Sequence, residues 1–173
     1  LDYTSLVLKL LAAVPVSYQL RKLLTTASIH TNCFANVLDL LVLLNKEKRY
    51  MSAVMLLVNE IAARYGCQRV SLGWLEGRYV RIQALSHMDR FEKKMNAVQE
   101  LETAMEESLE QDEEIVLPGS VGSETITRDH ELYDRRNGFG KLLSLPIRID
   151  GTPTAVLTCE RADSDFSKEE IHA

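Results

Sequence analysis

The sequence predicts an α+β protein: an antiparallel β-sheet with helices on both faces, preceded by an N-terminal helical arm. Runs of alternating apolar and polar residues flank two tight turns, Glu76-Gly77 and Asp150-Gly151, as in β-hairpins. Segments with apolar residues at helical spacing precede, separate and follow these hairpins. The 173 residues are enough for one domain with its own hydrophobic core.

Residues 1–32 are predicted to form the helical arm and residues 33–173 the folded domain. Pro15 should kink or end the helix within 4–24, because proline removes a backbone donor. A second helix, at about 33–45, is apolar nearly all round, so it must bury two sides. We expect either a homodimer through the N-terminal helices or an arm that folds back over this second helix.

The remaining elements follow in order along the chain. A helix at about 48–65 has the clearest i, i+3, i+4 pattern, and Gly66 caps it. Helices are also expected at about 92–110, whose Glu-rich side we interpret as solvated, and within 120–138, from Thr127 to the Asn137-Gly138 end. Strands are expected in the hairpin 67–85, at 115–117, at 141–149 and after Gly151. Ser167 and Glu170 form a capping box for a last helix.

Alternation within the four longest strands predicts an apolar sheet face and a semi-polar one. The helices at 33–45, 48–65 and from 167 should cover the apolar face. The helices at 92–110 and within 120–138 should cap the semi-polar face and leave a cleft with hydrogen-bonding groups. The apolar set is Val70, Leu72, Trp74, Val80, Ile82, Ala84, Leu143, Leu145, Ile147, Ala155, Leu157 and Cys159.

Eight polar residues are candidates for binding a small molecule in this cleft. Most belong to the semi-polar strand face, two follow the second strand, and Tyr133 lies on the inserted segment, where it and His130 could close a lid. The alternatives are that His87 only caps the next helix and that Arg81 pairs internally with Glu160. For His130 we expect an exposed helical turn. The candidates are Ser71, Arg81, Gln83, His87, Arg90, Tyr133, Ser144 and Thr158.

Composition argues against several classes of protein. A net charge of −5 and a pI near 5.4 do not favour nucleic-acid binding. No apolar run reaches the roughly 18 residues of a membrane span. We therefore expect contact with a membrane only through flanking domains. Three scattered cysteines suit a reducing, cytoplasmic compartment. The sequence shows no series of a nucleophile, a base and an orienting residue, and no phosphate-binding loop, so we expect no enzyme. His30 and Cys33 alone make a weak metal-binding motif, so we expect no metal site.

The order of motifs resembles a GAF domain over about 33–173. The motifs are "GCQRVSLGWLEG", "LLSLPIRIDGTPTAVLTCER" and "FSKEEI". The runs "RVSLGW", "ALSHMDRFEKKMN" and "ITRDHELYDRRNGFGKLLSLP" are similar to the cytoplasmic GAF domains attached to bacterial membrane-fusion proteins of the haemolysin-secretion type. Those proteins also carry a biotin/lipoyl-like hairpin domain, which is not visible in this sequence.

The resemblance implies a small-molecule pocket on one sheet face, a dimer through outer helices and a sensory or regulatory role. Residue sets typical of members that bind cyclic nucleotides or bilins, or that reduce free methionine sulfoxide, are not found, so the sequence does not identify the ligand or a cofactor. Our first hypothesis is a non-enzymatic regulatory domain that binds an unidentified small molecule and transmits through dimeric outer helices. The alternative is a structural dimerisation or assembly domain without a ligand. A thiol enzyme would need a reactive cysteine, whereas Cys159 is interpreted as inert core.

Overall fold

A computed structural model describes residues 39–40, 42–44, 46–88, 92, 95–119, 125–138 and 140–171, without the side chain of Glu169. Leu44–Ala173 form one compact unit. Residues 39–40 and 42–44 have helical backbone, in agreement with part of the helix predicted at 33–45. The predicted arm, the rest of that helix and the candidate ligand residue Arg90 lie outside the described residues.

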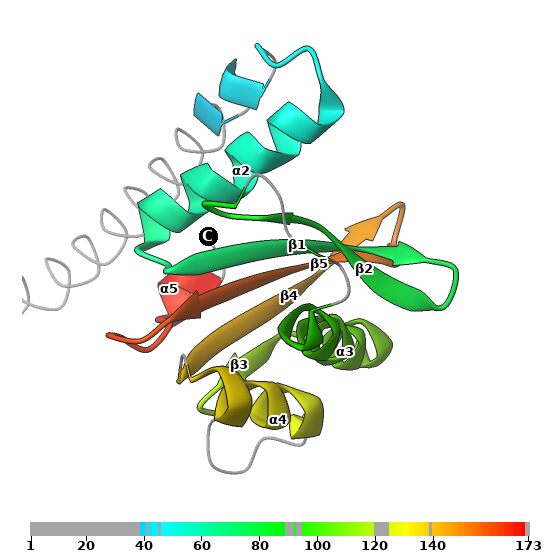
Figure 1. The fold of residues 1–173 in the computed structure, drawn as a ribbon, viewed down its shortest axis with the longest axis vertical. Coiled ribbons are helices and arrows are strands. Elements are labelled where there is room, and N and C mark those ends of the chain that lie inside the picture. Colours follow the sequence, from blue (N-terminus) through cyan, green and yellow to red (C-terminus); the bar gives the residue numbers. More distant parts are fainter. Residues whose placement is uncertain are drawn as a thin grey trace, which may run out of the picture. The chain divides into compact units, whose positions relative to one another are not determined.

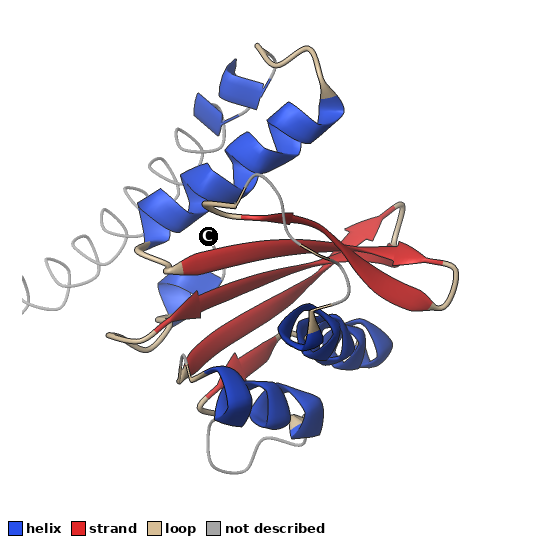
Figure 2. Ribbon diagram, in the orientation of Figure 1, coloured by secondary structure: helices blue, strands red, loops and turns tan. Residues whose placement is uncertain are grey.

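The core of the unit is a five-stranded antiparallel sheet in the order β2-β1-β5-β4-β3 (Figures 1 and 2). Both predicted hairpins and the short strand at 115–117 are confirmed, because local alternation and turn residues specify them. The strands are β1 (Arg69–Glu76), β2 (Tyr79–Leu85), β3 (Ile115–Leu117), β4 (Lys141–Ile149) and β5 (Thr152–Arg161).

Helices cover both faces of the sheet, as predicted for the α+β fold. In Figure 1, α2 and α5 lie on one side of the sheet, and α3 and α4 lie on the other. Gly66 and Gly138 end α2 and α4 in the left-handed conformation, with φ of 61° and 74°, which glycine adopts without steric cost. The helices are α2 (Tyr50–Tyr65), α3 (Asn96–Gln111), α4 (Arg128–Asn137) and α5 (Lys168–Ile171).

The α2/α5 face of the sheet is apolar. Val54, Val58 and Ala62 of α2 pack on it, and most of the predicted apolar set is found there. Each fully buried aliphatic side chain of this kind contributes about 1.5–3 kcal/mol. The members in this cluster are Val70, Leu72, Trp74, Ala84, Leu143, Leu145, Ala155, Leu157 and Cys159.

The prediction that Val80 and Ile82 share this face with Ala84 was wrong. Between β1 and β2 the register shifts, so that Leu72 pairs with Ala84 while Gly73 pairs with Ile82. Gln83 is therefore an extra residue, a β-bulge, and side chains before and after a bulge point to opposite faces. Val80 and Ile82 pack with α3 residues such as Leu101 in the second core cluster.

Glutamates of α3 bind the outer edge of β2. The backbone N–H of Val80 donates to Glu106 Oε1 at 2.8 Å, and that of Ile82 to Glu102 Oε1 at 3.0 Å. Glu102 also forms an ion pair with Arg81 at 2.9 Å. The interpretation of the Glu-rich side of this helix as merely solvated is therefore wrong for these two residues, which satisfy donors that an edge strand leaves unpaired.

Arg161 joins the end of β5 to α2 and α5. Its guanidinium donates to the Tyr65 carbonyl at 2.9 Å and to both carboxylate oxygens of Glu170, at 3.0 and 2.8 Å, and it stacks on the Phe166 ring. The hydrogen bond from Arg161 is the main reason that the pKa of Glu170 falls to about 2. Glu170 also completes the predicted capping box with Ser167.

Gly73 allows β1 to approach α3 closely. A Cβ at this position would lie 2.5 Å from Val80 Cγ1 and 2.7 Å from Met105 Sδ. We expect Gly73→Ala to lower the free energy of unfolding by about 1–3 kcal/mol, because the packed neighbours must move. Urea unfolding measures this, with Gly119→Ala as the matched control, since its Cβ would meet only the Val116 carbonyl at 3.6 Å. Equal stability of the two variants would contradict the close approach.

Candidate functional site

A row of three buried hydroxyls crosses the sheet under α3 and α4. Ser71 of β1 pairs with Thr158 of β5, which pairs with Ser144 of β4, so their side chains share one face. All three are 0% exposed. Ser144 Oγ and Thr158 Oγ1 are hydrogen-bonded at 2.8 Å. The Ser71 hydroxyl has no hydrogen-bond partner among the described residues.

His130 of α4 connects this row to Glu107 of α3. Its Nε2 lies 2.8 Å from Ser144 Oγ, and its Nδ1 donates to Glu107 Oε2 at 2.7 Å. The same carboxylate accepts the backbone N–H groups of Asp129 and His130 at 3.0 and 3.1 Å. Burial favours a higher pKa for Glu107, but these hydrogen bonds hold its pKa below the ordinary value. Glu107 thus places a negative charge at the N-terminus of α4.

A second buried polar group involves Tyr133, one turn further along α4. Arg69 donates to both carboxylate oxygens of Glu160 and to the hydroxyl of Tyr133. Glu160 is 0% exposed, so its charge requires this partner. Burial is the main reason that the pKa of the Tyr133 hydroxyl is raised, and the charge of Glu160 adds to it. The predicted alternative for Arg81, a pair with Glu160, is wrong, since Arg69 occupies that position.

The side chains of α3 and α4 fill the face on which the cleft was predicted. Four of these side chains are at most 2% exposed: Leu101, Met105, His130 and Tyr133. The polar residues expected at the bottom of the cleft are therefore present, but the side chains of α3 and α4 cover them in the described conformation. The expectation of an open cleft and of an exposed His130 is wrong, because the inserted α4 packs on the floor instead of standing away from it.

Four of the eight candidates converge on this closed site: Ser71, Tyr133, Ser144 and Thr158. The other described candidates do not. Arg81 binds Glu102, and Gln83 donates to Glu76 Oε1 at 2.8 Å on the exposed hairpin. His87 has a left-handed backbone, and its N–H donates to Asn59 Oδ1 of α2 at 2.8 Å, so it lies toward the opposite face. Arg90 falls outside the described residues.

Sequence reasoning missed Glu107 and Arg69 as members of the site, and it placed His130 outside it. The signal for Arg69 was present, since it lies opposite Glu160 once β1 and β5 are aligned. Glu107 carries no such signal, because it resembles its acidic neighbours on α3.

The series Ser144–His130–Glu107 has the connectivity of a nucleophile, its base and an orienting carboxylate. Nothing in the sequence pattern indicated it, since the three residues come from β4, α4 and α3. In the described conformation Ser144 and His130 are 0% exposed, which leaves no room for a substrate. His130 also belongs to the helix that would have to move to admit one, so opening the site would remove the base from Ser144.

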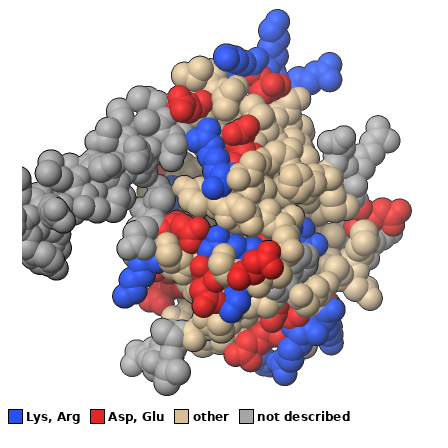
Figure 3. Space-filling model, turned by 90° about the vertical axis from the view of Figure 1, so that its left-hand side faces the viewer, with Lys and Arg blue, Asp and Glu red and all other residues tan. Residues whose placement is uncertain are grey.

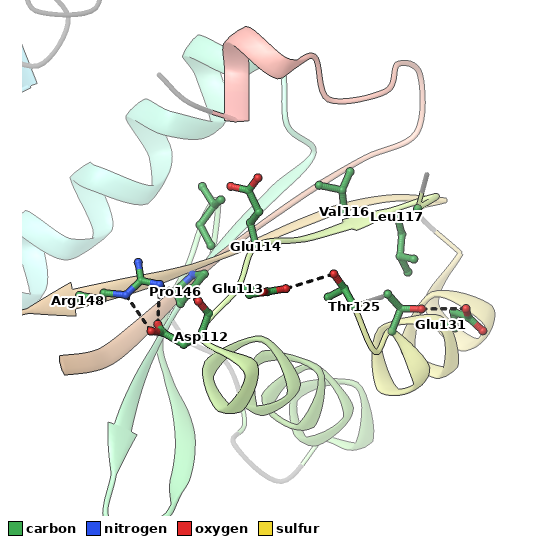
Figure 4. A pocket seen from close by; sticks show the side chains of 12 residues that line it. Asp112, Glu113, Glu114, Val116, Leu117, Thr125, Glu131, Pro146 and Arg148 are labelled. Carbon is green, nitrogen blue, oxygen red and sulfur yellow. Dashed lines mark hydrogen bonds and ion pairs between the residues drawn. The ribbon is translucent and has the colours of Figure 1, made fainter. Parts of the chain in front are cut away.

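An open cavity of about 770 Å³ lies at the β3 edge of the sheet (Figure 4). Most of its charged lining is already engaged: Arg148 pairs with Asp112, Thr125 donates to Glu113 and Thr127 to Glu131. Its excess of carboxylates favours cations over anions. None of the eight candidate residues lines this cavity. The full lining is Asp112, Glu113, Glu114, Val116, Leu117, Gly119, Thr125, Thr127, Glu131, Leu145, Pro146 and Arg148.

The face shown in Figure 3 carries acidic and basic side chains interspersed with each other. Within the described part of the chain, no helix has the length and apolarity to cross a bilayer. The described residues also contain no cluster of three or more potential His, Cys, Asp or Glu metal ligands. The weak His30 and Cys33 motif lies outside them.

Comparison with known proteins identifies the family. The GAF domain profile matches residues 52–173, and the chain belongs to the GAF domain family. The members of this family are generally sensory or regulatory domains that bind small molecules. A search of curated protein sequences found no match.

Several solved structures share the fold at low identity. The GAF domain of a phosphoenolpyruvate-protein phosphotransferase from Coxiella burnetii is 15% identical, with a TM-score of 0.57 over 82% of this chain and 85% of that one. Its counterpart from Acinetobacter is also 15% identical, with a TM-score of 0.59 over 79% and 82%. The chromophore-binding domain of Stigmatella aurantiaca phytochrome P1 is 14% identical, with a TM-score of 0.51 over 75% and 51%.

We expect His130→Ala to destabilise the protein by about 2–4 kcal/mol, because it leaves a cavity and removes a hydrogen-bond partner from both Glu107 and Ser144. Urea unfolding followed by circular dichroism measures this change. The matched control is His87→Asn at an exposed left-handed position, where Asn is tolerated and the cost should stay within about 0.5 kcal/mol. A His130→Ala cost no larger than the control would mean that His130 does not hold α4.

Proposed function

We propose that this chain is a non-enzymatic sensory or regulatory GAF domain whose small-molecule site is the polar row beneath α4. Ser71, Ser144 and Thr158 form the floor of this site, and Tyr133 and His130 form its cover. The described conformation is then the closed state. A ligand that prefers the open state shifts the balance between the two arrangements of α4 by its difference in affinity.

The observation that carries this proposal is the buried, unpartnered hydroxyl of Ser71. Leaving a buried polar group without a partner costs about 1–3 kcal/mol, and the apolar face opposite shows that this sheet can be packed without such groups. Ser71 adjoins Thr158 and is 0% exposed. A polar ligand entering under α4 would supply its missing partner. The row is a hydrogen-bonding surface without net charge, which suits a small polar molecule.

The alternative is a structural assembly domain without a ligand. The filled state of this face favours it, because Tyr133 and His130 already occupy the space above the floor and satisfy most of its polar atoms. In that case α4 is a fixed part of the core, and the domain serves to hold neighbouring segments in place.

A thermal-shift experiment distinguishes the two. The wild-type chain is screened against nucleosides, cyclic nucleotides, amino acids, sugars and small carboxylic acids. The same panel is applied to Glu100→Ala, which removes the acceptor of Arg136 and Asn137 and loosens α4 without touching the floor. A ligand present at about 100 times its Kd stabilises the folded state by about 2.7 kcal/mol, which raises Tm by several degrees.

We expect at least one compound to raise Tm more in Glu100→Ala than in the wild type. A larger fraction of the variant is in the open, binding-competent state, and this increases the apparent affinity for the compound. Ser71→Ala should weaken the same compound's effect by removing a floor hydroxyl. If no compound shifts any of these proteins, the assembly function is correct instead. A shift unaffected by Ser71→Ala would place the ligand elsewhere, with the β3-edge cavity as the next site to test.

The setting of the domain is part of the proposal. We propose a bacterial, cytoplasmic protein that dimerises through its N-terminal helices and meets a membrane only through flanking domains. A role without nucleic acid fits the net charge of −5. The closer resemblance to GAF domains of membrane-fusion proteins stays a hypothesis, since the comparisons support the family and not that subset.

Leu43→Asp tests the dimer. The predicted helix at 33–45 is apolar nearly all round, so a charge at Leu43 should weaken self-association at least tenfold while the sheet stays folded. Analytical ultracentrifugation measures the association, and Lys46→Asp, which changes charge without removing an apolar side chain, is the control. A monomeric wild-type chain would refute transmission through dimeric helices.

A further inference from the structure

Two cysteines far apart in the sequence meet where α2 ends. Cys67 follows the Gly66 cap of α2, and Cys159 lies on β5 opposite Val70 of β1. Both side chains belong to the same apolar cluster under α2, and they are 6% and 5% exposed. The Cys67 thiol donates to the Tyr65 carbonyl at 3.8 Å, and each thiol is the largest influence on the pKa of the other. Neither is in a disulfide.

The backbone before β1 brings Cys67 to this position. Its N–H donates to the Ala62 carbonyl of α2 at 2.9 Å, and the next residue, Gln68, donates to the Glu160 carbonyl of β5 at 2.8 Å. Cys67 therefore lies in the corner between a helix and a strand, outside the ladder of β1. A disulfide needs Cα atoms about 4.4–6.8 Å apart, so its formation tests whether the Gly66–Cys67 corner meets this requirement.

The two thiols differ in acidity. The hydrogen bond from Cys159 is the main reason that the pKa of Cys67 is lowered, burial opposes it, and the positive charge of Arg161 adds to the lowering. The pKa of Cys159 is raised by its hydrogen bond to Cys67 and by burial. Such a difference separates an attacking thiolate from a resolving thiol.

We propose that Cys67 and Cys159 are a modification site, a thiol pair that a hydroperoxide converts to an intramolecular disulfide. The Cys67 thiolate attacks one peroxide oxygen, the O–O bond breaks, and Cys67 becomes a sulfenic acid while the hydroperoxide is reduced to water or an alcohol. The Cys159 thiolate, having lost its proton, then attacks the Cys67 sulfur and displaces hydroxide, which takes up a proton as water. Two thiols are thereby oxidised by two electrons, and no other reactant is needed.

The disulfide would link the C-terminus of α2 to β5. It would lie beside Arg161, whose hydrogen bonds also hold α5. Both helices at this end of the domain would then be fixed to the sheet by a covalent link that reduction reverses. This inference does not depend on a ligand beneath α4, because the thiol pair lies on the opposite face of the sheet.

Oxidation with hydrogen peroxide tests the proposal. The full chain and a Cys33→Ser variant are treated in their folded state, and the products are analysed by mass spectrometry under non-reducing conditions. We expect loss of two hydrogen atoms and a peptide linking Cys67 to Cys159 in both proteins. Since the fold holds the thiols together, the link should form roughly tenfold faster in folded protein than in urea.

Single variants identify the roles of the two thiols. Cys159→Ser should stop at a Cys67 sulfenic acid that dimedone traps, whereas Cys67→Ser should leave Cys159 unmodified; circular dichroism checks that both fold. Over-oxidation of Cys67 without a disulfide in the full chain would overturn the proposal, as would a disulfide involving Cys33 alone or equal rates in folded and unfolded protein.

Discussion

The carboxylate of Glu107 is the contact on which the arrangement of the α3/α4 face depends. It accepts hydrogen bonds from the ring and backbone of His130 and from the backbone of Asp129, so one buried anion fixes the start of α4. A carboxylate that accepts several N–H groups stays ionised despite burial. The position of α4 in turn allows the hydrogen bonds between His130 and Ser144 and between Arg69 and Tyr133. Removing this anion would release all these contacts together.

The helices α2 and α4 are held to the sheet by different forces, and this suits a regulatory domain. Toward α2 the contacts are apolar and depend little on direction. Toward α4 they are hydrogen bonds and ion pairs, and only His130 and Tyr133 of that helix are buried. Polar contacts of this kind can be exchanged for equivalent contacts to a ligand at little net cost, whereas an apolar helix cannot leave its core without exposing it to water. A change of state is therefore expected at α4 and not at α2.

The sequence predicted those parts of the fold that depend on neighbouring residues. The turns at Gly77 and Gly151, the cap at Gly66 and the capping box at Ser167 are local and were correct. The bulge at Gln83 was not visible, because one extra residue leaves the alternation intact while reversing the faces of Val80 and Ile82. His130 was misplaced for a similar reason: its partners lie 14 and 23 positions away. Only the tertiary fold brings them together, as the pairing of β1 with β5 does for Arg69 and Glu160.

The two carboxylates that bind the amides of Val80 and Ile82 also protect the protein from self-assembly. An edge strand with free amides is a template on which another chain can add a strand, the first step towards fibrils. Glu106 and Glu102 already occupy two of these positions, and a carboxylate repels an approaching acidic chain of the same sequence. Burial raises the pKa of Glu106, so on acidification this carboxylate loses its charge before carboxylates of ordinary pKa, and the β2 edge loses part of this protection.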